Sequence, residues 1–85
     1  MSWFVYILRC ADDSLYTGIT NDKPRRLKQH NAGKASKYTR SKLPVDMVYT
    51  ETAEDRSSAT KRELKIKSLS RQQKLALIDN KLETK

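Results

Sequence analysis

Several residue types are scarce in this sequence, and each scarcity removes a class of protein. Cys10 is the only cysteine, so the chain has no internal disulfide, and with a single histidine it cannot build a tetrahedral zinc site. Two glycines leave no glycine-rich loop to cradle phosphates, and with two prolines they argue against a disordered or fibrous chain. No run approaches the ~20 apolar residues that span a bilayer. The first residues also lack the basic segment of a signal peptide. We therefore expect a cytoplasmic protein with no membrane partner.

The 85 residues leave room for one domain, spanning residues 1–85. Its positive charge is unevenly placed: residues 23–42 carry eight Lys or Arg and no acid, whereas residues 43–55 carry four acids and no base. Basic blocks of this kind attract phosphate polymers. The alternative is a solvated face that only aids solubility. An acid-free run of this length in a folded domain favours a polyanionic partner over that alternative, with an anionic membrane surface as a weaker option.

The apolar pattern predicts an α+β domain in the order β-β-α-β-α-α, with a small three-stranded antiparallel sheet flanked by helices. The strand from Trp3 to Cys10 is nearly continuously apolar and is expected to be central. The other strands are expected at residues 15–20 and 45–50, and the helices at about residues 23–31, 53–67 and 71–80. Residues 34–43 are expected to form a short helical turn or a loop.

Local residue choices sharpen these boundaries. Gly18, inside the second strand, indicates a bulge or a close backbone approach, and Gly33 is the expected end of the first helix. Leu27 is expected to face the sheet. The third strand alternates Val45, Met47 and Tyr49 against Asp46 and Val48, and the last helix places Leu75, Ile78 and Leu82 on one face. The expected helix caps are Asp22 for the first helix, Thr52 with Asp55 for the second, and Ser70 with Gln73 for the third.

Five polar side chains interrupt these elements and are the candidates for chemistry: Tyr6, Tyr16, Arg26, His30 and Glu63. Arg26 and His30 are four residues apart, so they share a helical face that can border the sheet. The planar fork of Arg26 suits a phosphate group. Each candidate alone has an ordinary alternative: a surface arginine, a helix-end histidine favoured by the helix dipole, two packed tyrosines, and a glutamate in a helix-surface ion pair.

Together, the same residues resemble the signature of the GIY-YIG nucleases. Tyr6 lies ten residues upstream of Tyr16-Thr17-Gly18, and the following Arg26-Leu27 and His30-Asn31 are similar to the extended second motif of that family in residue type and spacing. Residues 59–67, which hold Glu63, resemble the later helix whose glutamate binds the metal. Two runs, residues 30–34 and 37–40, resemble the small, stand-alone bacterial branch. Of the first triplet, Phe4-Val5-Tyr6, only the tyrosine is retained.

The resemblance implies a reaction and a role for each residue. Glu63 would hold one Mg²⁺ or Mn²⁺ ion through oxygen, which suits a hard cation. Arg26 would bind the phosphate and stabilise charge in the transition state. Tyr16 would orient or deprotonate the attacking water, with Arg26 and the metal favouring its phenolate form. Tyr6 would support this network by hydrogen bonding, and His30 could share the role of base or position the water.

The resemblance also implies a substrate. Lys34, Lys37 and Arg40 would grip flanking DNA phosphates, which give affinity rather than base specificity. We therefore expect a metal-dependent endonuclease in DNA repair or processing, with little sequence specificity and RNA as an alternative substrate. It would select a flap, nick or single strand, or a protein partner would supply targeting. The alternative is a nucleic-acid-binding module with weak or no catalysis.

Overall fold

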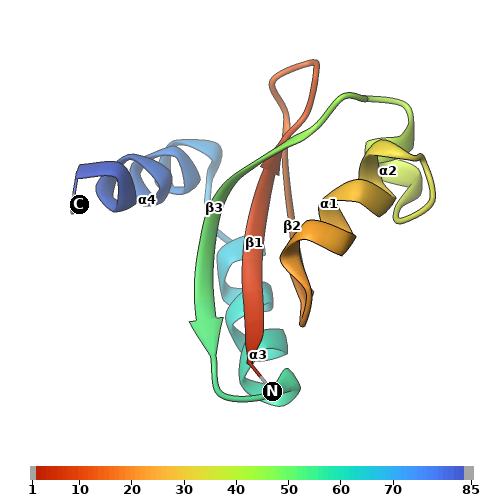
Figure 1. Cartoon of the computed structure of the whole chain (residues 1–85). Helices are drawn as coiled ribbons and strands as arrows, with labels where there is room; N and C mark the ends of the chain where they lie inside the picture. The colour runs from red at the N-terminus through yellow and green to blue at the C-terminus, as the bar shows by residue number, and fades with distance from the viewer. Residues whose placement is uncertain (1, 84–85) are drawn as a thin grey trace.

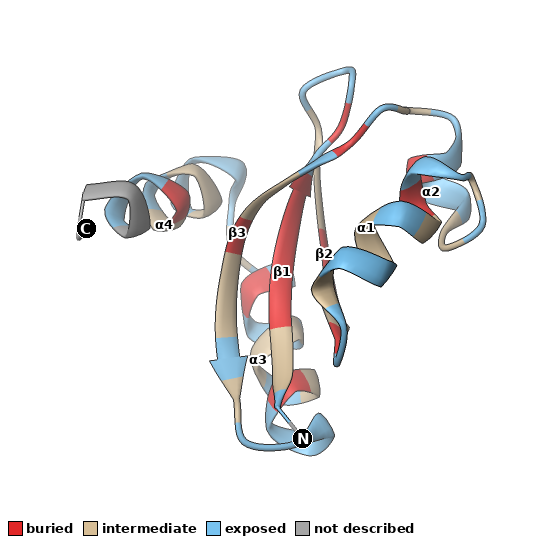
Figure 2. Ribbon diagram, in the orientation of Figure 1, coloured by how far each residue is buried: buried red, intermediate tan, exposed pale blue. Residues whose placement is uncertain are grey.

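The sheet is built around one central apolar strand. The computed structural model describes residues 2–83, and for residues 81–83 it describes the backbone alone. Strand β1 (Trp3–Arg9) pairs antiparallel with β2 (Leu15–Thr20) on one side and with β3 (Asp46–Ala53) on the other, which gives the order β2-β1-β3 (Figure 1). Residues 5–8 of β1 are all buried, because both faces of this strand are covered (Figure 2). The predicted antiparallel sheet and central strand are confirmed.

Helices cover both faces of this sheet. On one face lie α1 (Lys23–Asn31) and the one-turn helix α2 (Lys37–Arg40), and on the other lie α3 (Arg56–Lys67) and α4 (Arg71–Glu83). The core under α1 comprises Tyr6, Leu8, Cys10 and Val45, with Leu27 packed against it as expected. The core under α3 and α4 comprises Val5, Ile7, Tyr49, Ala59, Ile66 and Ile78. The predicted element order is confirmed, and α2 is the short helical turn that was one of the two expectations for residues 34–43.

Two of the three expected helix caps are present. The Asp22 carboxylate accepts from the Arg25 amide at 3.1 Å and begins α1. Ser70 and Gln73 exchange reciprocal bonds of 2.9 and 3.2 Å between side chain and backbone. The expectation for Thr52 is wrong, because Thr52 lies inside β3; Asp55 alone caps α3. Gly33 follows the end of α1 with φ +75°, a conformation that favours glycine, which confirms it as the helix stop.

Strand β3 differs from its expected bounds and alternation. It begins at Asp46 rather than Val45 and runs to Ala53, since β1 continues to pair with it as far as Trp3. A bulge shifts the register from Ile7 opposite Tyr49 to Leu8 opposite Met47. Met47 and Tyr49 therefore pack into different cores, and the predicted alternation fails at this point.

Helix α4 is three residues longer than its predicted end at Asn80. Leu75 and Ile78 pack against the core under α3, whereas the side chain of Leu82 lies outside the described residues. Strand β1 ends at Arg9, one residue before its predicted end. No helix in residues 2–83 combines the length and the apolar character needed to cross a bilayer.

Candidate active site

Tyr6 lies directly against the backbone of Gly18. The two residues face each other across β1 and β2. A Cβ atom added to Gly18 would lie 2.5 Å from Tyr6 Oη and 2.7 Å from its ring carbon Cζ, closer than such atoms approach in proteins. The close backbone approach predicted for Gly18 is therefore present, and it fixes the tyrosine ring over the edge strand.

A buried hydrogen-bond chain continues from this tyrosine. Tyr6 Oη lies 2.9 Å from His30 Nε2, and His30 Nδ1 lies 2.9 Å from Thr39 Oγ1. The Thr39 hydroxyl donates to the Ser36 carbonyl at 3.4 Å, so it is free to accept from His30 Nδ1–H. This assigns His30 Nε2 as the acceptor of the Tyr6 proton.

Burial decides the protonation of both partners. Burial raises the pKa of Tyr6 well above its usual value; Tyr16 and Glu63 raise it further, and only Arg26 opposes them. His30 is 1% exposed, and its pKa is lowered by burial first and by the Arg26 charge second. At neutral pH, Tyr6 therefore keeps its proton and His30 stays uncharged.

Tyr16 lies between the buried hydrogen-bonded residues Tyr6 and His30 and the protein surface. Its ring meets the His30 ring edge-on, with centroids 5.4 Å apart and planes at 64°. On another side it stacks with Tyr38, with centroids 5.8 Å apart and planes at 27°. Tyr16 remains half-buried in β2, so it has access to solvent that Tyr6 and His30 lack.

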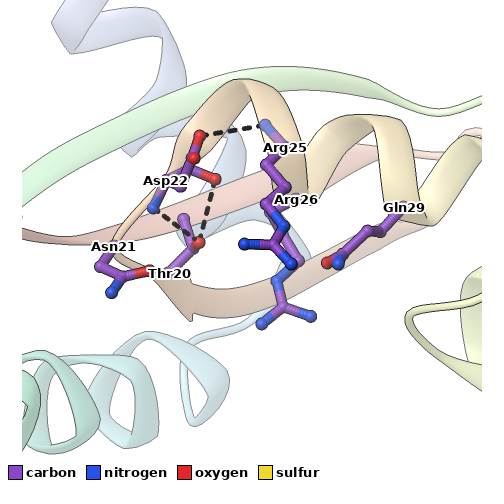
Figure 3. Close-up of a pocket in the computed structure, with 6 residues that line it drawn as sticks. All are labelled: Thr20, Asn21, Asp22, Arg25, Arg26 and Gln29. Atoms are coloured by element: carbon purple, nitrogen blue, oxygen red, sulfur yellow. Dashed lines mark hydrogen bonds between the residues drawn. The ribbon is translucent and has the colours of Figure 1, made fainter.

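Arg26 brings a positive charge to the same region. Its Nε is buried and has no hydrogen-bond partner among the described residues. A polar pocket of about 220 Å³ adjoins it (Figure 3), lined by Thr20, Asn21, Asp22, Arg25, Arg26 and Gln29. The guanidinium groups of Arg25 and Arg26 and the Gln29 amide gather on one side of α1. A buried N–H without an acceptor is costly, so an anion here would satisfy it.

Glu63 reaches the site from α3, which packs along the edge strand β2. Its carboxylate is close enough to Tyr6 to raise the pKa of that residue, together with Tyr16. The Glu63 side chain is 17% exposed, and its Oε2 lies 3.2 Å from the Nζ of Lys67 one turn later. The structure thus groups Tyr6, Tyr16, Arg26 and His30 beside β2. Glu63, on α3 across the sheet, is linked to this group through the effect of its charge on Tyr6.

The donor set is a single carboxylate. Among the described side chains, those of residues 2–80, no three His, Cys, Asp or Glu form a cluster that could hold a metal ion. One carboxylate nevertheless fits Mg²⁺, which usually keeps several waters and completes its shell with substrate phosphates. Glu63 is therefore the residue of this site that could hold a divalent cation, in exchange for its contact with Lys67.

The predicted DNA-binding side chains lie beside the site. Lys34 follows α1, while Lys37 and Arg40 belong to α2, and all three are at least partly exposed. Thr39, between Lys37 and Arg40, is the residue that bonds His30. The α2 segment that carries these basic residues is thus anchored by the buried hydrogen bond between Thr39 and His30.

Two contributors, Tyr38 and Thr39, were not predicted as site residues. Both belong to the run Lys37-Tyr38-Thr39-Arg40, which resembles the stand-alone branch, but that resemblance does not predict their contacts with residues in other elements. Asn31 is a further case: its side-chain amide bonds both backbone groups of Val45, at 2.8 and 3.1 Å, and ties the end of α1 to the approach to β3. The resemblance of His30-Asn31 to the extended second motif marked this asparagine in the sequence, but it gave no role for the side chain.

A tyrosine packed on a glycine across two strands, an arginine and histidine one helical turn apart, and a glutamate on a later helix define a GIY-YIG type of domain. The family model described as the GIY-YIG catalytic domain matches residues 2–76, and the chain belongs to this family. Proteins of this superfamily are generally endonucleases, and they typically use divalent metals.

More closely, the relatives are small UPF0213 proteins, a stand-alone branch of the family. The UPF0213 protein of Desulfotalea psychrophila is 54% identical over 78 residues, covering 91% of this chain and 71% of the relative. That of Staphylococcus haemolyticus is 49% identical, covering 92% of this chain and 95% of the relative. The solution NMR structure of a UPF0213 protein from Bacillus halodurans is 43% identical with a TM-score of 0.61, covering 95% of this chain and 86% of that one.

Proposed function

We propose that this chain is a divalent-metal-dependent endonuclease that hydrolyses DNA phosphodiester bonds with little sequence specificity, in the processing or repair of DNA. One observation carries the proposal: the buried, unpartnered Nε of Arg26 lies in the same site as the Tyr6–His30 pair, Tyr16 and Glu63. A charged donor without an acceptor among the described residues, next to a carboxylate and a half-buried tyrosine, suits a phosphodiester group.

The phosphate is assigned to Arg26. Its guanidinium would bind the non-bridging oxygens and stabilise the charge that gathers on them in the transition state. Its companion in the pocket, Arg25, extends the positive charge along α1. Because the Arg26 Nε is already desolvated, binding a phosphate there requires little further loss of hydration for that donor.

Tyr16, Tyr6 and His30 would have different roles in positioning the attacking water. Tyr16 is the ring with access to solvent, so its oxygen would orient the attacking water or, as a phenolate, take the proton of that water. Tyr6 keeps its own proton and donates a hydrogen bond to His30 Nε2, so it would serve as a fixed support. His30 accepts from Tyr6 and donates to Thr39, so it would hold the two tyrosines in place and leave the water to Tyr16.

The metal is assigned to Glu63. Its carboxylate would hold one Mg²⁺ or Mn²⁺ ion, replacing the Lys67 ammonium that now lies 3.2 Å away. When bound, the ion supplies charge neutralisation at the phosphate and help for the departing 3′ oxygen. Glu63 is mostly shielded from solvent, which strengthens its attraction for a cation.

The role of binding the DNA backbone is assigned to the basic residues of α2 and of the loop before it. Lys34, Lys37 and Arg40 reach solvent and could bind phosphates on either side of the cut. Contacts of this type read the backbone and not the bases, so sequence preference should be small. A preference for a flap, a nick or a single strand, or a protein partner, would then direct cleavage.

The test is cleavage of a panel of labelled DNAs: intact duplex, nicked duplex, flap and single strand, each with a matching RNA. Wild type should cut at least one DNA when Mg²⁺ or Mn²⁺ is present. Arg26→Ala should lower kcat by roughly 10²- to 10³-fold, the usual cost of removing one transition-state donor. Lys28→Ala, an exposed lysine on the same helix, is the matched control and should cut at nearly the wild-type rate.

Equal cleavage rates for Arg26→Ala and Lys28→Ala would show that Arg26 takes no part in the reaction. DNA binding by wild type without cleavage of any substrate, under either metal, would instead support the alternative of a nucleic-acid-binding module.

A further inference from the structure

Tyr38 is exposed by 42%, yet its ring is engaged by two other side chains. It stacks on Tyr16 with centroids 5.8 Å apart, and the Nζ of Lys42 lies 4.0 Å from the centroid of its ring. Lys42 is in turn 3.4 Å from Asp12 Oδ2 in the turn between β1 and β2. A continuous row, Asp12–Lys42–Tyr38–Tyr16, therefore runs from the hairpin turn to the candidate active site.

The backbone under Tyr38 is fixed by the site itself. The Ser36 side chain caps α2 and accepts from the Tyr38 amide at 3.1 Å. The next residue, Thr39, is fully buried and bonds His30. Tyr38 is therefore held against Tyr16 by the same helix turn that anchors the buried hydrogen-bond chain.

Tyr16 needs such a contact. Its side chain turns about two torsions, and its ring contacts the buried cluster under α1 and meets the His30 ring in a T-shaped pair. Tyr38 supplies a stacked contact on another side, in the offset geometry that aromatic pairs prefer. With Lys42 over its ring and Tyr16 stacked on it, Tyr38 already has aromatic and cation partners within the protein, which favours a role inside the site over a role as a platform for a nucleobase.

We propose that Tyr38 is a positioning residue for Tyr16: its ring, backed by Lys42 and Asp12, sets the orientation in which the Tyr16 hydroxyl meets the attacking water. This rests on the role given to Tyr16 in the proposed function. A misplaced reactive group lowers the rate of the chemical step without weakening substrate binding. The effect of losing Tyr38 should therefore fall on kcat, whereas loss of a residue that binds DNA would fall on KM.

The experiment compares Tyr38→Ala, Tyr38→Phe and the control Ser41→Ala at the exposed end of α2. Tyr38→Ala should lower kcat by roughly 10- to 100-fold, the scale expected for a misplaced catalytic group, with KM unchanged. Tyr38→Phe keeps the ring and should restore the rate, and Ser41→Ala should match wild type. DNA affinity, measured in a Glu63→Gln background that binds without cutting, should be the same for all three.

A second measurement does not depend on cleavage. Nuclear Overhauser contacts between the rings of Tyr16 and His30 should be strong in wild type, weak in Tyr38→Ala and restored in Tyr38→Phe. If wild type cleaves nothing, the proposed function fails, but these contacts still decide whether Tyr38 holds Tyr16. If Tyr38→Ala does not fold, Tyr38→Leu takes its place, because leucine keeps apolar volume without a stacking ring.

Two results would overturn the proposal. Unchanged kcat and unchanged ring contacts in Tyr38→Ala would show that Tyr16 is oriented without Tyr38. A loss confined to KM and DNA affinity would make Tyr38 a nucleic-acid contact instead.

Discussion

His30 is the single histidine of the chain and one of its most completely buried side chains. Both of its ring nitrogens are used, one toward Tyr6 and one toward Thr39. Burial and the charge of Arg26 lower its pKa below the usual 6.5. The folded state therefore favours the neutral ring, and this contribution to stability is present above about pH 6.5 and is lost as the pH falls through the folded pKa.

We expect the imidazole of His30 to titrate below pH 6.5 in the folded protein. Proton NMR of the ring follows this without assignment ambiguity, because there is only one histidine. The free energy of unfolding in urea should also fall as the pH is lowered from neutral toward mildly acidic. A ring that titrates at or above the usual value, with stability unchanged over that interval, would contradict the buried hydrogen-bond chain.

Residue-scale features of this site were only partly predictable from the sequence. The four-residue spacing of Arg26 and His30 placed them on one helical face, and Gly18 indicated a close approach before its partner Tyr6 was known. The link from His30 to Thr39 could not be predicted, because it joins two helices across a loop whose path the sequence leaves open.

Helix α3 matters as an element because it carries Glu63 into the site. Its first turn contains no acidic residue, so the N-terminal amides depend on the Asp55 cap, which accepts from the Ser58 amide at 2.8 Å. These hydrogen bonds lower the pKa of Asp55. The stabilisation they give is present above the usual carboxyl pKa and is lost as the pH falls through the folded value.

Asp55→Ala should lower the thermal midpoint at neutral pH, because the first turn of α3 loses its cap. Thr52→Ala should have a much smaller effect, since Thr52 is an exposed strand residue. Thermal unfolding followed by circular dichroism distinguishes the two. A larger loss for Thr52→Ala would mean that the helix begins where the sequence pattern first indicated.

The elements themselves were predicted well wherever apolar runs and turn residues agreed, as in β1, β2 and α1. The bulge in β3 was not predictable, because it depends on how Ile7 and Leu8 pair with a strand distant in sequence. The same pairing draws Thr52 into the sheet and moves the start of α3 to Arg56. Tertiary pairing thus overrode a local capping signal.

At the scale of the whole molecule, we predict DNA binding that is governed by salt. Replacing Lys34, Lys37 and Arg40 together with alanine should reduce the slope of log affinity against log salt by about 0.9 for each phosphate that the protein no longer neutralises. The matched control is a triple substitution of equal charge on α3 and α4, at Lys61, Lys65 and Lys74. Fluorescence anisotropy of labelled DNA over a salt series gives both slopes. Equal slopes would show that net charge alone, and not the α2 segment, binds DNA.

The central claim is that Glu63 completes a metal-dependent nuclease site, and cleavage of a supercoiled plasmid by wild type, Glu63→Gln and Glu54→Gln with Mg²⁺ or Mn²⁺ tests it most directly. Glu54 is exposed in the loop before α3, so its substitution removes the same charge outside the site. We predict nicking or linearisation by wild type and Glu54→Gln that stops when the metal is chelated, and none by a folded Glu63→Gln. Cleavage by Glu63→Gln at the wild-type rate would contradict the claim.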